Sequence, residues 1–375
     1  MAVTATPKKG LEDIIAGQTS ICFIDGTEGR LVYRGYNIHD LVKGSFEETS
    51  YLLLYGVLPT ESQLKDFTIG LKKELTLPIE VINFIKTLPK DEHPMASLRS
   101  AVSFLGHFDS ASEDNSHPSN IRKSISLIAK TSMIVAYINS SRNGGEFTAP
   151  NPDFSFAKNF LWMVYGSEPN DRDVNIMDTA LILHADHEFN ASTFTARVIA
   201  ATLSDMYSAV TGAIGALKGP LHGGANEQVM KMLLEVGTVD NAKAWITDAL
   251  INKKKIMGFG HRVYKTEDPR ATHLRKMSKD IGIEEGQTQW YQISEIIEQF
   301  ILEQKGLYPN VDFYSASTYY VMGIPFDLYT PIFAASRIAG WCAHVIEQHD
   351  DNRLIRPAGD YIGKTNETYV DIANR

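Results

Sequence analysis

Apolar residues recur at i, i+3 and i+4 through most of this chain, a spacing that places them on one face of an α-helix. Glycine or proline follows most of these stretches, as at Gly56 and Gly306, where a helix is expected to end. Only residues 19–25 and 30–33, which flank Gly26 to Gly29, predict a short β-hairpin. The predicted helices span residues 46–55, 61–75, 121–139, 156–165, 174–184, 191–217, 227–236, 240–252, 269–282, 289–304 and 331–348.

The pattern therefore predicts an all-α fold, and the length of the chain predicts two domains. A chain of 375 residues exceeds what one simple core fills, so a large and a small domain are expected. No repeat, low-complexity tract or flexible linker separates them, which favours a small helical domain inserted into a large one. Residues 1–220 and 325–375 are expected to form the large domain, and residues 221–324 the small one.

Composition places the protein among ordinary soluble globular chains, with 43% hydrophobic and 22% charged residues. Residues 1–10 are polar and lack the apolar core of a signal peptide. Cys22 and Cys342 form no CxxC pair or metal-ligand spacing, which suits a reducing cytoplasm. The most apolar stretch, residues 198–217, contains Asp205 and is expected to be a buried helix, not a membrane span. We therefore expect a cytoplasmic protein without a membrane partner.

Charge is unevenly distributed along the chain. The net charge of −9 argues against a nucleic-acid partner. Residues 253–279, however, contain nine Lys and Arg against two acidic residues, which favours an anionic small-molecule substrate. The cations that adjoin a histidine and glycines are interpreted as functional: Arg262, Lys265 and Arg270. Those farther along at helical spacing are interpreted as a solvated helix face: Arg275, Lys276 and Lys279.

Three polar islands interrupt the apolar stretches in the second half of the chain, at residues 219–226, 258–262 and 309–313. Glycines beside the histidines would allow a ligand to approach the backbone, and site residues tend to lie on such loops. Each island contributes one side chain that can transfer a proton: His222, His261 and Asp312. Together the three indicate acid–base catalysis, although a single core histidine beside a glycine is common.

A fourth polar island, residues 184–193, lies between two predicted helices. His184 and His187 stand at i, i+3 and, with Glu188, could bind the metal of a hydrolase. The segment is not an HExxH motif, however, and no other Cys/His pair is near in sequence, so no metal is expected. Alternatively, His187 and Asn190 donate hydrogen bonds to an anion at the start of the next helix, while His184 is structural. A non-catalytic helical binding protein is a further alternative.

These islands and several flanking segments resemble the citrate synthase family, in order and along nearly the whole chain. Residues 19–26 and 31–36 are similar to the opening of its short bacterial and archaeal members. The resemblance continues through residues 184–193, 217–227, 258–271 and 309–317 and the pair Ser336-Arg337. No position that the family uses for chemistry departs from its pattern.

The resemblance implies an α-helical homodimer that condenses acetyl-CoA with oxaloacetate and hydrolyses the citryl thioester, a step of the tricarboxylic acid cycle. Both compounds are substrates, so no cofactor is implied. Asp312 would remove a methyl proton from acetyl-CoA, and its apolar neighbours should desolvate it and strengthen it as a base. His222, if neutral, would donate a hydrogen bond to the thioester oxygen. His261 would deliver a proton to the oxaloacetate carbonyl.

The resemblance also implies the residues that bind the two substrates. Those for oxaloacetate are His187, Arg270 and Arg337, with Arg356 contributed by the partner subunit. Those for coenzyme A are Lys255, Gly258 and Gly260 near the adenine, with Arg262 and Lys265 near the phosphates. Oxaloacetate bridging both expected domains should close them. 2-Methylcitrate synthase, which uses propionyl-CoA, is the alternative, because one methylene changes binding by only about 1–3 kcal/mol.

Overall fold

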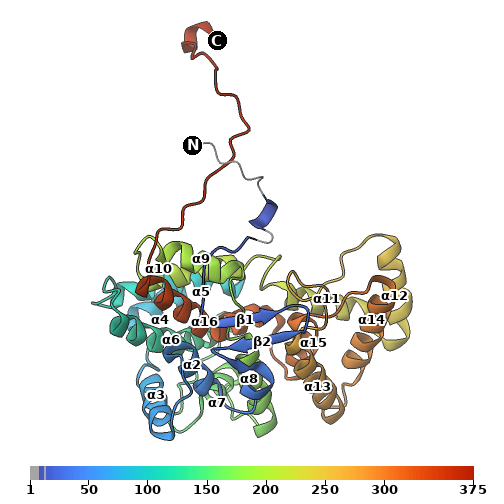
Figure 1. The fold of residues 1–375 in the computed structure, drawn as a ribbon. Helices are drawn as coiled ribbons and strands as arrows, with labels where there is room; N and C mark the ends of the chain where they lie inside the picture. The colour runs from blue at the N-terminus through green and yellow to red at the C-terminus, as the bar shows by residue number, and fades with distance from the viewer. Residues whose placement is uncertain (1–7, 12–13) are drawn as a thin grey trace.

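Helices dominate the computed structural model, which describes residues 8–11 and 14–375 (Figure 1). These residues form sixteen α-helices and a three-stranded sheet. The helical fold that the apolar pattern predicts is confirmed. Most of the polar N-terminal stretch, interpreted above as lacking a signal peptide, lies outside the described residues.

The sheet is an antiparallel meander whose first two strands form the predicted hairpin. β1 (Cys22–Asp25) pairs with β2 (Arg30–Tyr33), and β2 pairs with a short third strand that the sequence pattern does not predict, β3 (Tyr36–Asn37). Tyr33 is fully buried, and its hydroxyl donates to the Asp186 carbonyl oxygen at 2.8 Å. The sheet is thereby fixed to the fourth polar island.

Most helices form one large bundle around α16 (Tyr329–Asp350), which is buried along almost its whole length. The bundle comprises α1 (Ile38–Leu41), α2 (Phe46–Tyr55), α3 (Glu61–Lys73), α4 (Ile79–Thr87), α5 (Pro94–Leu105), α6 (His117–Arg142), α7 (Phe156–Tyr165), α8 (Asp171–His184), α9 (Ala191–Ala200) and α10 (Met206–Leu217). Because α8 and α9 pack against α16, the turn between them lies beside the centre of the core. Short 3-10 helices occur at Lys9–Leu11, Gly106–Phe108, Phe326–Leu328 and Ile372–Asn374.

The other five helices pack against one another on one side of the bundle, on the right in Figure 1. They are α11 (Ala225–Val236), α12 (Val239–Ile251), α13 (Pro269–Glu284), α14 (Gln289–Lys305) and α15 (Val311–Val321). α15 packs against α11 and α13, and α11 also contacts α16. This second group of helices coincides with the residues expected to form the small domain, and the division into two domains stays a prediction.

One predicted helix is wrong, because residues 191–217 form two helices, α9 and α10. The chain breaks at Leu203, whose backbone is left-handed with a φ of 65°. Asp205 then caps α10 by accepting the Ser208 N–H at 3.0 Å. The apolar pattern runs through the break and hides it. No helix in the described part of the chain is long and apolar enough to cross a membrane.

The solvated face expected on α13 is confirmed for Lys276 and Lys279, which are exposed. It is wrong for Arg275, which is half-buried and forms ion pairs with Glu267 and Glu298. The aliphatic part of an arginine can pack while its guanidinium group is paired, so helical spacing alone does not separate the two cases.

Beyond α16 the chain leaves the bundle as an extended arm, residues 351–375 (red in Figure 1). Arg356 lies on this arm, which is exposed almost throughout. The arm carries large exposed apolar side chains: Leu354, Tyr361, Ile362, Tyr369 and Ile372. Burial of such side chains against another surface is favourable in water.

Candidate active site

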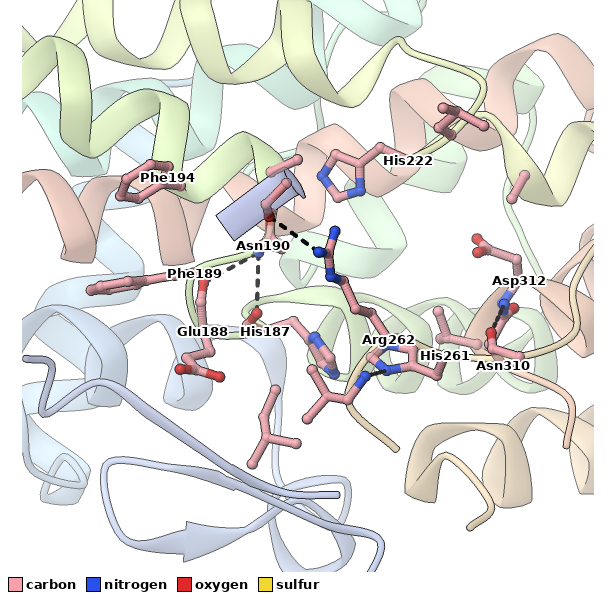
Figure 2. A pocket seen from close by; sticks show the side chains of 18 of the residues that line it. His187, Glu188, Phe189, Asn190, Phe194, His222, His261, Arg262, Asn310 and Asp312 are labelled. Carbon is pink, nitrogen blue, oxygen red and sulfur yellow. Dashed lines mark hydrogen bonds between the residues drawn. The ribbon is translucent and has the colours of Figure 1, made fainter. Parts of the chain in front are cut away.

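A pocket of about 1090 Å³ opens where the bundle meets the second group of helices (Figure 2). It is lined by the turn after α8, by α16, by the loops at residues 220–224 and 255–265, and by the starts of α11 and α15. Eleven of the twelve site residues predicted from the sequence line it: His187, His222, Lys255, Gly258, Gly260, His261, Arg262, Lys265, Arg270, Asp312 and Arg337. The twelfth, Arg356, lies on the exposed arm, outside the pocket of its own chain.

His187 lies in the turn between α8 and α9, beside the loop that carries His261. The centres of the two rings are 5.0 Å apart, and the Tyr264 hydroxyl lies 3.2 Å from His187 Nε2. Burial, helped by the charge of Arg270, lowers the pKa of His187 well below its usual range. The ring is therefore neutral at pH 7, with one nitrogen to donate and one to accept.

His261 is held in one tautomer by the backbone that follows it. Its Nδ1 accepts the N–H groups of Val263 at 3.0 Å and Tyr264 at 3.2 Å. Because Nδ1 is an acceptor, the proton of the neutral ring is on Nε2. Burial and the Arg270 charge lower the pKa of His261 to about 4. His261 is thus a neutral hydrogen-bond donor at pH 7.

His222 follows the turn at the end of α10, and its ring contacts Ser192 in the first turn of α9. Ser192 Oγ lies 2.8 Å from His222 Nε2, and the Ser192 backbone N–H also points at Nε2, at 3.3 Å. A backbone amide can only donate, so it favours the tautomer with the proton on Nδ1. Burial, with a contribution from Arg337, lowers the pKa of His222 to about 4.

Asp312 occupies the first turn of α15 at the wall of the pocket. Asn310 caps this helix by accepting the Asp312 N–H at 3.1 Å, and its amide donates to the Gly260 carbonyl oxygen at 3.1 Å. Burial raises the pKa of Asp312 to about 7, against the opposing charge of Arg270. Among the described residues, Asp312 Oδ1 has no hydrogen-bond partner. A carboxylate in this state is a stronger base than an exposed one.

Arg270 brings a buried cation to the pocket from the first turn of α13. Its Nε and Nη2 donate to the two oxygens of Asp268, the N-cap of the helix, at 2.9 and 2.7 Å. Burial alone would lower the pKa of Arg270, but the adjacent carboxylate raises it, so the guanidinium group stays charged. Asp268 thereby fixes the plane of that group, and Arg270 lines the pocket.

Arg337 brings a second buried cation from α16. Its Nε donates to the His184 carbonyl oxygen at 2.6 Å, and its guanidinium carbon lies 4.7 Å from the centre of the Phe333 ring. Burial lowers the pKa of Arg337 to about 10, although the nearby Asp186 opposes this effect. Nη1 is buried and has no hydrogen-bond partner among the described residues. Such an unsatisfied donor favours an anionic ligand.

The loop of residues 255–265 presents backbone and positive charge at the pocket. Gly258 and Gly260 adopt φ values of 81° and 77°, which favour glycine, and a Cβ on Gly258 would lie 2.8 Å from Phe313. The three cationic side chains of the loop are exposed: Lys255, Arg262 and Lys265. Arg262 donates to the Gly10 carbonyl oxygen at 3.1 Å. Exposed cations around a pocket suit the phosphates of a ligand.

His184 is buried and does not line the pocket, which agrees with a structural role. It is 1% exposed, its Nδ1 donates to the Ala180 carbonyl oxygen at 2.7 Å, and burial lowers its pKa to about 3. Within residues 8–11 and 14–375, no group of three or more His, Cys, Asp or Glu residues is placed to hold a metal ion. The structure thus provides no ligand set for the hydrolase alternative with His184, His187 and Glu188.

Four residues that position the site were not assigned a role from the sequence: Ser192, Tyr264, Asp268 and Asn310. Asp268 and Asn310 could have been identified from the sequence, because each is a residue type favoured at helix N-caps and stands two positions before a predicted site residue. Ser192 and Tyr264 could not, because their contacts join residues 30 and 77 positions apart.

Three neutral histidines, a carboxyl group with a raised pKa and two buried arginines in one pocket are the groups expected of an acid–base enzyme for an anionic substrate. Residues 10–358 match the family model described as citrate synthase, C-terminal domain. The chain belongs to the citrate synthase family, and the resemblance seen in its motifs is confirmed.

Relatives of the chain match it over nearly its full length. Citrate synthase 2 of Bacillus subtilis is 51% identical over 373 residues, covering 99% of this chain and 100% of the relative. Citrate synthase of Deinococcus radiodurans is 48% identical, covering 98% of each chain. 2-Methylcitrate synthase 2 of Corynebacterium glutamicum is 43% identical, covering 100% of this chain and 99% of the relative.

The chain is also similar to a solved structure that contains ligands. This structure is the ternary complex of citrate synthase from the thermophilic archaeon Thermoplasma acidophilum with carboxymethyl coenzyme A and oxaloacetate. It superposes with a TM-score of 0.94 at 37% identity, covering 99% of this chain and 100% of that one.

Proposed function

We propose that this protein condenses acetyl-CoA with oxaloacetate and hydrolyses the citryl-CoA formed, releasing citrate and CoA. The observation that carries the proposal is the buried carboxylate of Asp312, with a pKa raised to about 7, in one pocket with the neutral His222 and His261. The names of the relatives and the ligands of the Thermoplasma acidophilum complex support the same reaction.

In the first step, Asp312 removes a proton from the methyl group of acetyl-CoA. A carboxylate is a weak base for a carbon acid, so the oxyanion that develops on the thioester must be stabilised as it forms. His222, with its proton on Nδ1, donates a hydrogen bond to that oxygen, an interaction typically worth about 3 kcal/mol. A neutral donor is suited to this task because it need not first be charged in a buried site.

In the second step, the enol carbon attacks the oxaloacetate carbonyl. His261 donates from Nε2 to the carbonyl oxygen and supplies the proton that this oxygen carries once the carbon–carbon bond has closed. Water then cleaves the citryl thioester and releases the thiol of CoA.

The two substrates bind in different parts of the pocket. The two carboxylates of oxaloacetate pair with Arg270 and Arg337 and with His187, because planar guanidinium groups match planar carboxylates. On the other side, residues 255–260 meet the adenine of coenzyme A, and Arg262 and Lys265 lie near its phosphates.

The two-domain division, with residues 221–324 as the small domain, is part of this proposal. Oxaloacetate ligands come from both sides, Arg337 and His187 from the bundle and Arg270 from α13, so the dianion favours a closed arrangement. Closure excludes water during condensation. Each substrate should then tighten binding of the other by the same factor, and calorimetric titrations with non-reactive analogues measure this coupling. Affinities that are independent of the second ligand contradict it.

A homodimer is also proposed, with Arg356 contributed to the site of the partner subunit. The exposed apolar side chains of the arm, such as Tyr361 and Ile362, support this arrangement, since the arm extends away from the helices of its own chain (Figure 1). A cytoplasmic location is proposed too, in which the buried Cys22 and Cys342 stay free thiols.

Thiol release from acetyl-CoA, with and without oxaloacetate, tests the proposal. Release that depends on oxaloacetate and persists in a chelator is expected. No thiol release, or thiol release without oxaloacetate, would contradict the proposal. Loss of thiol release in the chelator would favour the metal-dependent hydrolase. Propionyl-CoA in place of acetyl-CoA tests the alternative 2-methylcitrate synthase, which the Corynebacterium glutamicum relative keeps open. A higher kcat/KM with propionyl-CoA would favour that enzyme.

A further inference from the structure

The turn of the β1–β2 hairpin lies against the loop that carries His261, although the two are far apart in sequence. Lys265 donates its backbone N–H to the Gly26 carbonyl oxygen at 2.7 Å. At the other end of the turn, Gly29 lies against Thr266 and the carbonyl oxygen of Glu267. The turn Asp25–Gly29 therefore contacts residues 263–267 largely through backbone atoms.

Gly26 is the point of closest approach. A Cβ at this position would lie 2.1 Å from the carbonyl oxygen of Val263 and 2.8 Å from its carbonyl carbon. Both are backbone atoms, so a clash there cannot be relieved by a rotamer change. Gly26 has no left-handed backbone that would by itself call for glycine. The close approach of Val263 is therefore the reason for glycine at this position.

Val263 is also the residue that fixes the His261 ring. Its N–H donates to His261 Nδ1, while its carbonyl group rests on Gly26. Tyr264, the next residue, donates its N–H to the same nitrogen and places its hydroxyl beside His187. A displacement of the backbone at residues 263–264 thus moves the proton donor and its neighbour together.

We propose that the hairpin turn Asp25–Gly29 is a positioning element: it docks residues 263–267 and so holds His261 in its donating tautomer. The inference rests on the proposed function, in which His261 protonates oxaloacetate. On the coenzyme A side, Lys265 lies within the docked segment, but residues 258–260 do not depend on the turn, because they are held elsewhere. Gly260 donates to the Tyr308 carbonyl oxygen at 3.0 Å, and Asn310 donates to that of Gly258 at 2.9 Å.

Gly26→Ala is the most direct test. A misplacement near 1 Å can reduce catalysis about 100-fold, so kcat should fall about tenfold or more, and KM for oxaloacetate should rise. KM for acetyl-CoA should change less than about threefold, the effect expected for loss of the Lys265 charge alone, if residues 255–260 stay in place. Gly70→Ala is the matched control, because its Cβ would meet only Ile125, at 3.7 Å. Wild-type kcat in Gly26→Ala overturns the proposal.

A second pair of variants covers the case in which Gly26→Ala does not fold. Asp25 Oδ1 accepts the N–H groups of Thr27 at 2.9 Å and Glu28 at 3.0 Å, which shapes the turn, and Asp25 does not line the pocket. Asp25→Ala removes this acceptor and should lower kcat, whereas Asp25→Asn keeps an oxygen and should restore it. Equal losses in both variants overturn the proposal.

Hydrogen exchange separates failure of this inference from failure of the proposed function, because it needs no turnover. Exchange of backbone amides in residues 261–267 should be faster in Gly26→Ala and Asp25→Ala than in the wild type and Gly70→Ala. Unchanged exchange overturns the docking. An inactive wild type with these exchange differences would overturn the function and leave the docking supported.

Discussion

The pocket has two walls of different construction. The core wall, formed by the turn after α8 and by α16, holds His187 and Arg337 at 7% and 1% exposure. The loop wall, residues 255–265, has left-handed glycines and exposed cations. A buried guanidinium group binds through a few directed hydrogen bonds, whereas exposed lysines hold an anion by charge that solvent screens. From this comparison we expect the core wall, together with Arg270, to recognise oxaloacetate, and we expect the exposed cations of the loop wall to tolerate substitution.

Asp312 lies between the two walls, and its loss should have the largest effect. Asp312→Asn keeps the shape of the side chain but cannot accept a proton, so kcat should fall about 100- to 10,000-fold. Oxaloacetate binding, measured by calorimetry, should persist because both arginines are intact. Turnover near that of the wild type would remove Asp312 from the role of base.

The same variant should be more stable than the wild type at pH 8. The pKa of Asp312 is about 7 in the folded chain and near 4 in the unfolded chain, so protonation of its carboxyl group stabilises the fold. This stabilisation is complete below about pH 4 and is lost as pH rises through about 7. At pH 8 the wild type therefore carries a buried charge that the amide lacks. Tm should rise by about 2–4 °C at pH 8, and the difference should shrink near pH 4. A lower Tm at pH 8 would contradict the desolvation of Asp312.

On the core wall, Arg337→Lys tests directed recognition. A lysine keeps the charge but loses the planar fork, so KM for oxaloacetate should rise about 30- to 100-fold, as for a lost charged hydrogen bond. KM for acetyl-CoA should change less than about threefold. Arg270→Lys should behave similarly, and Arg275→Lys, on the same helix but outside the pocket, is its control. An effect on acetyl-CoA alone would mean that the two walls are assigned the wrong way round.

The pH profile should depend on the carboxylate and not on the histidines. Asp312 must be deprotonated, and its pKa is about 7, so kcat/KM should fall about tenfold per unit below pH 7. His222 and His261, with pKa values lowered to about 4, stay neutral down to about pH 5. A rate that is level from pH 5 to 8 would exclude Asp312 as the titrating base.

On the loop wall, single charges should matter least. Lys255→Ala and Lys265→Ala should each raise KM for acetyl-CoA only about threefold, as expected for an exposed ion pair. The effect should shrink further at high salt because exposed charges are screened. A loss above about thirtyfold, or one that is insensitive to salt, would mean that the loop wall is as ordered as the core wall.

The sequence predicts the helical fold well, but it fails where the environment overrides the apolar pattern. α15 is buried nearly throughout and carries buried polar residues such as Ser315 and Ser317. It therefore lacks the alternation of apolar and polar faces by which an amphipathic helix is predicted from sequence. The apolar pattern predicts α9 and α10 as one helix, because the chain breaks at a left-handed residue, Leu203, inside a run of apolar residues. Conversely, the helix predicted at residues 46–55 is confirmed, and the structure shows that a capping box of Ser45 and Glu48 stabilises its start.

The sequence identifies candidate site residues, but only the fold shows which of them lie close together. Spacing alone cannot place the ring centre of His187 5.0 Å from that of His261, because four helices, α9 to α12, separate the two residues in sequence. The family resemblance grouped them correctly around one pocket. It assigned no role to Tyr264 or Gly26, whose contacts with His187 and Val263 are visible only in three dimensions.

Arg337 Nη1, which has no hydrogen-bond partner in the described part of the chain, has a consequence outside catalysis. A buried donor without a partner destabilises the ligand-free fold, and a dicarboxylate that supplies the missing acceptor removes this penalty only in the folded chain. At 100 times its Kd, such a ligand stabilises the fold by about 2.7 kcal/mol, which suppresses the opening that proteases need. Substrate supply would then set the lifetime of the protein in the cell as well as its rate: a cell starved of the dianion would lose the enzyme itself.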